Sequence, residues 1–132
     1  MDRISSLLFF TGAYSILCLF NITLQSPPSH LIGKKKWDFI GQYISLVHAI
    51  TSVILSLYIY LIESGVHYSQ ATNSYHTLVI SHSIGYFLYD MIFAEVTGIH
   101  DWAMRTHHCC ILLGGTIMYM AETGGSAAVC KN

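Results

Sequence analysis

The residues of this sequence best suited to chemistry are histidines and a carboxylate that lie inside apolar runs. Asp90 lies in the run VISHSIGYFLYDMIFAEV (79–96), and His107 and His108 form a pair further along the chain. An imidazole beside a carboxylate is a common arrangement for moving a proton. An ionisable group within hydrocarbon costs about 3 kcal/mol on insertion scales. Such residues therefore need a reason to be there, and we interpret Asp90, His107 and His108 as candidate catalytic residues.

Helical spacing gathers further polar side chains into two stripes. His82, Tyr86 and Asp90 are four residues apart, so they share one face of a helix, beside the small residues Ser81 and Gly85. A second stripe lies on an earlier helix and consists of Ser45, His48, Ser52 and Ser56. We interpret His48, His82 and Tyr86 as candidate substrate-binding residues.

Each stripe also has a structural interpretation. Small and hydroxyl side chains hold membrane helices together, and Asp90 would then pair with a histidine of a neighbouring helix. The adjacent residues His107 and His108 point about 100° apart, so one is expected to face the bundle and the other the interface. Two histidines on facing helices, His48 with His82 or with His108, leave a bis-histidine haem site as a third alternative.

Composition indicates a membrane protein. Of the 132 residues 53% are hydrophobic and only 10% are charged, whereas soluble domains average about 25% charged residues. A formal net charge of -1 provides no basic surface, so we expect no nucleic-acid partner. The four cysteines include no CxxC pair, and we expect neither a metal site nor a bound cofactor.

The apolar runs predict an all-α fold, a polytopic transmembrane bundle of about four spans. Each run is long enough to cross the roughly 30 Å of hydrocarbon as a helix. The expected spans are Ile4–Leu24, about Phe39–Ile62, about His76–Val96, and a fourth from near His107 past Met120 that Glu122 interrupts. The polar stretch from Ser64 to Tyr75 links the second and third spans. The first run could instead be a signal peptide, but it is long for one, and we favour a retained span.

The basic residues predict an orientation. Lys34, Lys35, Lys36 and Arg105 lie in two links on one side of the membrane, against Arg3 and Lys131 on the other. The positive-inside rule then places the basic loops in the cytosol and the N-terminus in a lumen or outside.

Taken together, four segments resemble the TLC family of membrane proteins, named for its TRAM, Lag and CLN members. They are Trp37 beside the basic loop, SLVHAITS (45–52), SHSIGYFLYD (81–90) and THHCCIL (106–112), in the family's order. The resemblance covers about residues 37–126. It divides the chain into residues 1–36, with the first span and basic loop, and residues 37–132, a partial TLC-like domain.

The resemblance implies helical spans in the endoplasmic reticulum and work on membrane lipids, with acyl-CoA as a further partner. Some members are ceramide synthases, which join a fatty acyl group to a sphingoid base, and their paired histidines belong to the active-site motif. That role would fall on His107 and His108, with Asp90 as an orienting carboxylate.

The chain also departs from the synthase pattern. Ile111 stands where the synthases have a threonine, and the chain ends at Asn132, before the later span with further histidines and aspartates. The sequence is therefore closer to the less characterised TLC proteins and is expected to be truncated. Whether it is an acyltransferase-like enzyme stays open, and a non-catalytic accessory subunit with membrane protein partners is the alternative.

Overall fold

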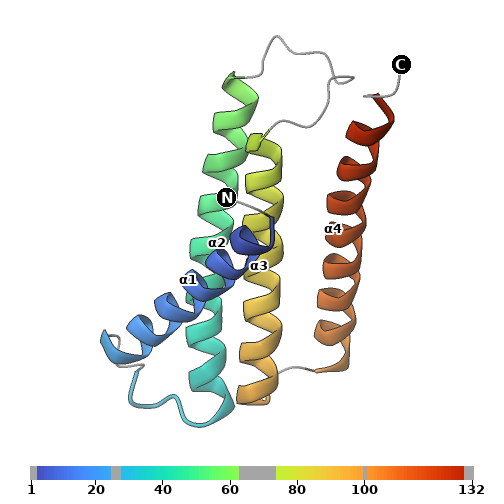
Figure 1. Cartoon of the computed structure of the whole chain (residues 1–132). Helices are drawn as coiled ribbons and strands as arrows, with labels where there is room; N and C mark the ends of the chain where they lie inside the picture. The colour runs from blue at the N-terminus through green and yellow to red at the C-terminus, as the bar shows by residue number, and fades with distance from the viewer. Residues whose placement is uncertain (1–2, 25–27, 63–73, 100, 130–132) are drawn as a thin grey trace.

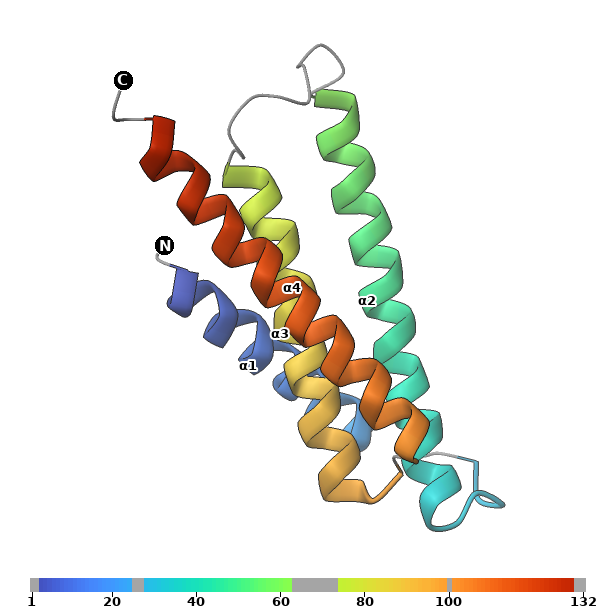
Figure 2. The same ribbon diagram turned by 90° about the vertical axis from the view of Figure 1, so that its right-hand side faces the viewer.

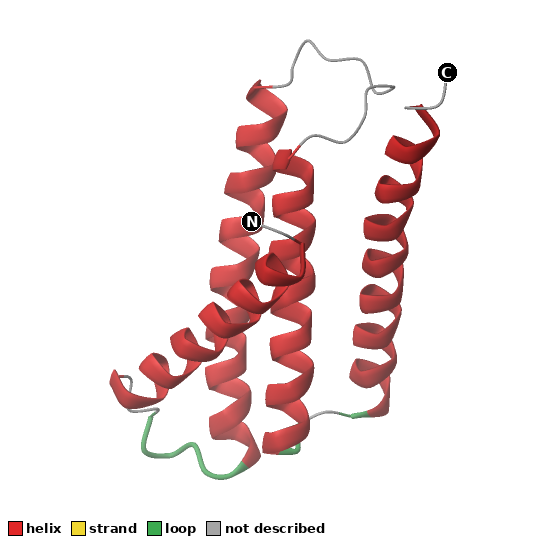
Figure 3. Cartoon of the chain, viewed as in Figure 1, coloured by secondary structure: helices red, strands yellow, loops and turns green. Residues whose placement is uncertain are grey.

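The computed structural model describes residues 3–24, 28–62, 74–99 and 101–129, and all regular structure in these ranges is α-helical (Figures 1 and 3). The helices are α1 (Arg3–Leu24), α2 (Lys34–Ile62), α3 (Ser74–Thr97) and α4 (Trp102–Val129). The prediction of an all-α helical bundle is confirmed. Most of the expected polar link from Ser64 to Tyr75 lies outside the described residues.

Three of these helices are long and apolar enough to cross a membrane, over Ile4–Leu24, Lys34–Leu61 and Thr77–Thr97. The protein is therefore an integral membrane protein by the length and composition of its helices. Helix α4 has 28 residues, but its apolar side chains are diluted by His107, His108, Glu122 and several glycines. The fourth span stays a prediction, although the backbone of α4 is helical through Glu122 to Val129.

The turn between α3 and α4 is shorter than the sequence indicated. Gly98 has a φ of 67°, and the Ile99 amide donates to the Ala94 carbonyl at 3.2 Å, which is the hydrogen bond of a Schellman motif. Helix α4 then begins at Trp102, more than a turn before the expected start at His107. The reason is local, because the Asp101 carboxylate caps the helix by accepting from the Met104 amide at 2.8 Å.

Helix α3 is the centre of the bundle. It packs against α1, α2 and α4, whereas α4 packs against α3 alone among the described helices. Figures 1 and 2 show α1 lying obliquely across α2 and α3, with α4 along the other side of α3. The described link at residues 28–33 and the turn at residues 98–99 lie at the same end of the bundle in Figure 1.

Close approach of α1 to α3 depends on one glycine. A Cβ atom at Gly85 would lie 2.6 Å from Cβ of Phe10 and 3.1 Å from the backbone nitrogen of Thr11. The Thr11 hydroxyl donates to the Gly85 carbonyl at 3.3 Å, as well as to the Leu7 carbonyl of its own helix. The expectation that small residues of this stripe admit a neighbouring helix therefore agrees with the structure.

Below this crossing, the three helices bury a mixed aliphatic and aromatic core. Ile40 and Ile44 of α2 are fully enclosed, and Tyr89 and Phe93 of α3 belong to the same cluster. Trp37, in the first turn of α2, makes an edge contact with Phe93 at a ring-centroid distance of 6.3 Å. This core fixes the rotation of α2 and α3 about their axes, and with it the direction in which their polar stripes point.

Candidate functional site

The polar stripes of α2 and α3 meet at a tyrosine of α1. The Tyr14 hydroxyl lies 2.5 Å from Nε2 of His82 and 3.2 Å from Nδ1 of His48. Tyr14 and His82 are buried, and His48 is partly buried. One hydroxyl therefore joins three helices through two imidazole rings.

A second contact closes the same group. The Tyr86 hydroxyl is hydrogen-bonded to the Ser45 hydroxyl at 2.7 Å, and the Tyr86 ring stacks on His48 with centroids 3.9 Å apart and planes 7° apart. We call this set the histidine–tyrosine cluster, and it consists of Tyr14, Ser45, His48, His82 and Tyr86. The predicted substrate-binding residues His48, His82 and Tyr86 all lie in it.

The serines of the α2 stripe divide between the cluster and the surface. Ser52 lies 3.4 Å from Nε2 of His48, one turn away on the same helix. Ser56, one turn further, is exposed. The stripe is therefore buried only where α3 and α1 cover it.

Asp90 lies outside this cluster and pairs with α4. Its Oδ2 atom is 3.0 Å from Nε2 of His108, and the two side chains are 15% and 5% exposed. The carboxylate and the imidazole thus face each other in a water-poor interface between two helices. This is the interhelical pairing that the structural interpretation expected, and it is also the geometry by which a carboxylate orients a histidine for proton transfer.

The two paired histidines of α4 separate as expected from helix geometry. His108 is buried against Asp90, whereas His107 is exposed. The ring centroids of His107 and His108 are 5.7 Å apart. Of the three predicted catalytic residues, the structure brings together Asp90 and His108 and leaves His107 outside. Whether any of them is catalytic stays a prediction.

The polar groups form one band through the bundle. The Phe87 ring separates His48 from His108, with centroid distances of 5.8 Å and 5.7 Å to the two imidazoles. On α3, Asp90 follows Tyr86 by one turn. The Asp90–His108 pair therefore lies one turn from the histidine–tyrosine cluster, with an aromatic wall between the two histidines.

Tyr14 is the functional candidate that sequence reasoning missed. Helix α1 contains no charged residue after Arg3, and the sequence prediction treated it as a plain span. Its buried face nevertheless carries a polar or small residue in each turn, at Thr11, Tyr14, Cys18 and Asn21. That three- and four-residue spacing was the available signal.

The geometry does not fit a haem. A haem takes its two axial nitrogens from opposite faces of the porphyrin. The rings of His48 and His82 instead stack directly, with centroids 5.0 Å apart and planes 22° apart, and Tyr14 bonds to a nitrogen of each. Phe87 occupies the space between His48 and His108. Neither pair leaves room for the macrocycle.

No grouping that could hold a metal ion was found either, within the described residues. There, no three or more histidine, cysteine, aspartate or glutamate side chains come close enough together. The arrangement can still move a proton between Asp90 and His108, or bind a polar group against the histidine–tyrosine cluster.

No protein-family model, curated protein or solved structure matches this chain. The resemblance to the TLC family therefore stays a prediction, carried by the segments around Trp37, His48, His82 to Asp90, and His107–His108.

Proposed function

We propose that this is a multi-pass membrane protein of TLC type that acts in the metabolism or homeostasis of membrane lipids, including acyl-chain or sphingolipid metabolism. The observation that carries the proposal is the buried contact between Asp90 and His108. Ionisable side chains within membrane helices are costly and are retained mainly where they serve a function. A lipid is the substrate class that reaches such a pair from within the bilayer.

The chemistry that suits this pair is acyl transfer from acyl-CoA to a lipid amine or hydroxyl. His108 would take the proton from the attacking nitrogen or oxygen as that atom bonds to the thioester carbonyl carbon. Asp90 would orient the ring and stabilise the imidazolium. The carbon–sulfur bond then breaks, and the departing CoA thiolate takes the proton from His108. His48, His82 and Tyr86, one turn away, would hold the polar part of the acceptor.

We further propose that the protein lies in the endoplasmic reticulum membrane with its N-terminus in the lumen. The support is that α2 and α4, which carry Lys34–Lys36 and Arg105 in their first turns, begin at the same end of the bundle (Figure 1). The positive-inside rule assigns that end to the cytosol, which is also where acyl-CoA would be supplied.

The function is tested by comparing the lipids of cells that make the wild-type protein or the His108→Gln variant at equal level. We expect the acyl-chain or sphingolipid changes caused by the wild type to disappear in the variant. His30→Gln is the matched control, because this histidine is exposed and lies in the link before α2. Equal lipid profiles for wild type and His108→Gln would overturn the proposal.

A second candidate is an accessory subunit of a larger membrane complex. It is favoured by the packing of α4, which among the described helices contacts α3 alone and so leaves much of its surface open for a neighbour. In this case Asp90→Asn would abolish co-purification with partner proteins without changing any turnover. A chain that purifies as a stable, solitary species would rule this candidate out.

A further inference from the structure

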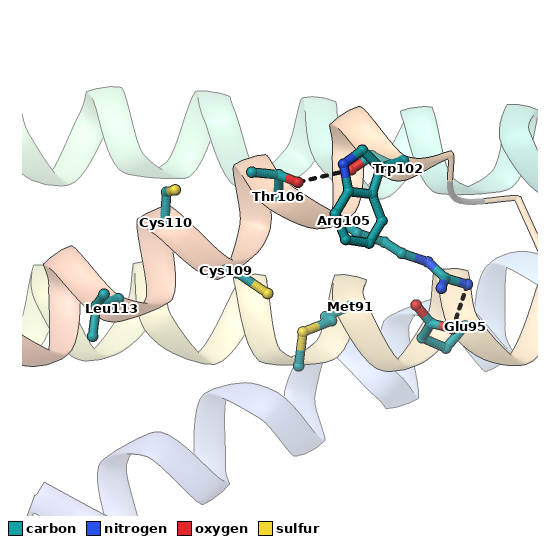
Figure 4. Close-up of a pocket in the computed structure, with 8 residues that line it drawn as sticks. All are labelled: Met91, Glu95, Trp102, Arg105, Thr106, Cys109, Cys110 and Leu113. Atoms are coloured by element: carbon teal, nitrogen blue, oxygen red, sulfur yellow. Dashed lines mark hydrogen bonds and ion pairs between the residues drawn. The ribbon is translucent and has the colours of Figure 1, made fainter.

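A groove of about 440 Å³ runs along the outer face of α3 and α4. Its walls are formed by Met91 on α3 and by Cys109, Cys110 and Leu113 on α4. Figure 4 shows the Cys109 side chain directed across the groove toward Met91. The three residues from α4 are exposed, so the groove opens to the surroundings and not into the core.

One end of the groove is polar. Arg105 donates to Glu95 at 2.9 Å, and both side chains are about half exposed, at 48% and 47% (Figure 4). Trp102, 80% exposed, lies at the same end. Tryptophan is enriched where a membrane meets water, and this end of the groove therefore marks the level of the lipid head groups.

The length of the groove matches one leaflet of a bilayer. From Arg105 to Leu113 helix α4 rises about 12 Å, and half of the hydrocarbon core is about 15 Å. A single acyl chain extending from the head-group level would fill this length. A transmembrane helix of a partner would instead need a face that continues through both leaflets.

The charges at the polar end identify the head group. One cation and one anion side by side present no net charge, and they complement a head group that carries both a phosphate and a quaternary or primary amine. A lipid with only a phosphate would draw Arg105 away from Glu95 without supplying a cation in its place, whereas the amine of a zwitterionic head group supplies that cation. Arg105 is suited to the phosphate because its guanidinium can donate two parallel hydrogen bonds.

We propose that the groove binds a zwitterionic glycerophospholipid, with one acyl chain between Met91 and Leu113, the phosphate at Arg105 and the amine at Glu95. The lipid would lie beside the Asp90–His108 pair. Two residues of the groove wall are sequence neighbours of this pair, since Met91 follows Asp90 on α3 and Cys109 follows His108 on α4. This inference rests on the proposed function, because it names the class of lipid held next to that pair.

Photo-crosslinking of the full chain tests the groove. The purified protein is placed in phosphatidylcholine nanodiscs with a trace of phosphatidylcholine that carries a diazirine in one acyl chain, and labelled peptides are mapped by mass spectrometry. We expect at least fivefold more label on residues 91–95 and 105–113 than on the exposed face of α2 around Leu57. Equal labelling of the two regions would overturn the proposal.

Three variants and a second probe sharpen the result. Cys109→Phe fills the groove and should lower the label there at least fivefold, whereas Ile117→Phe adds a comparable ring to an exposed position of α4 outside the groove and should leave the label unchanged. Arg105→Gln should lower it severalfold, and a phosphatidylglycerol probe should label less than phosphatidylcholine. Equal labelling of the two phenylalanine variants would contradict the site.

The proposed function and the groove can fail separately. His108→Gln leaves the groove walls intact, so the label should persist in this variant even though lipid turnover is lost. If the His108→Gln variant keeps the label and gives the same cellular lipid profile as the wild type, the groove is upheld and the catalytic proposal is overturned. Loss of the label in His108→Gln alone, with normal folding, would overturn the groove as described.

Discussion

At the scale of single residues, Tyr14 connects the parts of the polar interior. Its hydroxyl reaches His48 and His82, which come from different helices. A buried hydroxyl between two imidazoles can donate to one ring and accept from the other, so both rings are held in one orientation. The cluster is thus arranged by a residue of α1, although its histidines belong to α2 and α3.

Replacing Tyr14 by phenylalanine should destabilise the bundle without changing its shape. The substitution removes only the hydroxyl and leaves one nitrogen of His48 and one of His82 without that partner. We expect a loss of about 1 kcal/mol in the free energy of unfolding, since interhelical hydrogen bonds in membranes contribute about 0.6 kcal/mol on average and up to about 1.7. Titration with a denaturing detergent measures it. Tyr43→Phe, at a more exposed position of α2, is the control and should cost little.

Asp90 and His108 should behave as a coupled pair. Removal of either partner leaves the other buried without its counterpart, and we expect each alanine substitution to cost about 3 kcal/mol. The double variant should cost less than the sum of the two, with a coupling energy of about 1–3 kcal/mol. Unfolding of the four proteins of this double-mutant cycle provides the measurement. Simple additivity would show that the 3.0 Å contact does not stabilise the protein.

At the scale of helices, the crossing of α1 over α3 requires the absence of a side chain. Gly85 lies where the backbones approach too closely for even a Cβ atom. The same crossing brings Tyr14, one turn after Phe10, over His82. The position of the glycine therefore determines whether the histidine–tyrosine cluster can assemble.

A leucine at Gly85 should push the two helices apart. We expect a loss of at least about 2 kcal/mol in the free energy of unfolding, in the range typical of overpacking. Cross-linking between cysteines introduced on α1 and α3 should fall in parallel. Gly114→Ala is the matched control, because no atom lies within 4 Å of a Cβ there, and alanine favours a helix over glycine. Unaltered cross-linking in Gly85→Leu would show that the helices do not pack this closely.

At the scale of the whole molecule, the bundle is built around α3. Helices α1 and α2 enclose one of its sides with the histidine–tyrosine cluster, and α4 covers another with the Asp90–His108 pair. Helix α4 covers its side of α3 only in part, and the groove opens there, between α3 and α4. In our proposal, this partly covered side between α3 and α4 is where a lipid enters.

The arrangement of the ends can be tested by labelling. In a chain with its native cysteines replaced by alanine, a single cysteine at Ser29 or Ala103 should react with an impermeant maleimide from the cytosolic side of sealed microsomes. A cysteine at Ser5, at the opposite end of α1, should react only after the membrane is opened. Labelling of positions 29 and 103 from opposite sides would contradict the bundle, and labelling of both from the lumen would reverse its orientation.

Properties that depend on one helix at a time could be predicted from the sequence. Length and apolarity determined the first three helices, because a segment that crosses hydrocarbon must bond its own backbone groups whatever its neighbours are. The shared face of His82, Tyr86 and Asp90 follows from 3.6 residues per turn alone. So does the divergence of His107 and His108.

Properties that depend on how helices are rotated against one another were decided only by the tertiary structure. The sequence allowed either histidine of α4, or one of α2, to meet Asp90, and packing of α4 on α3 selected His108. The sequence contains no charged residue on α1 after Arg3 that would indicate Tyr14, whose partners follow from the close approach at Gly85. A pattern along one helix defines a face, but the side chain opposite that face depends on the shapes of all the helices together.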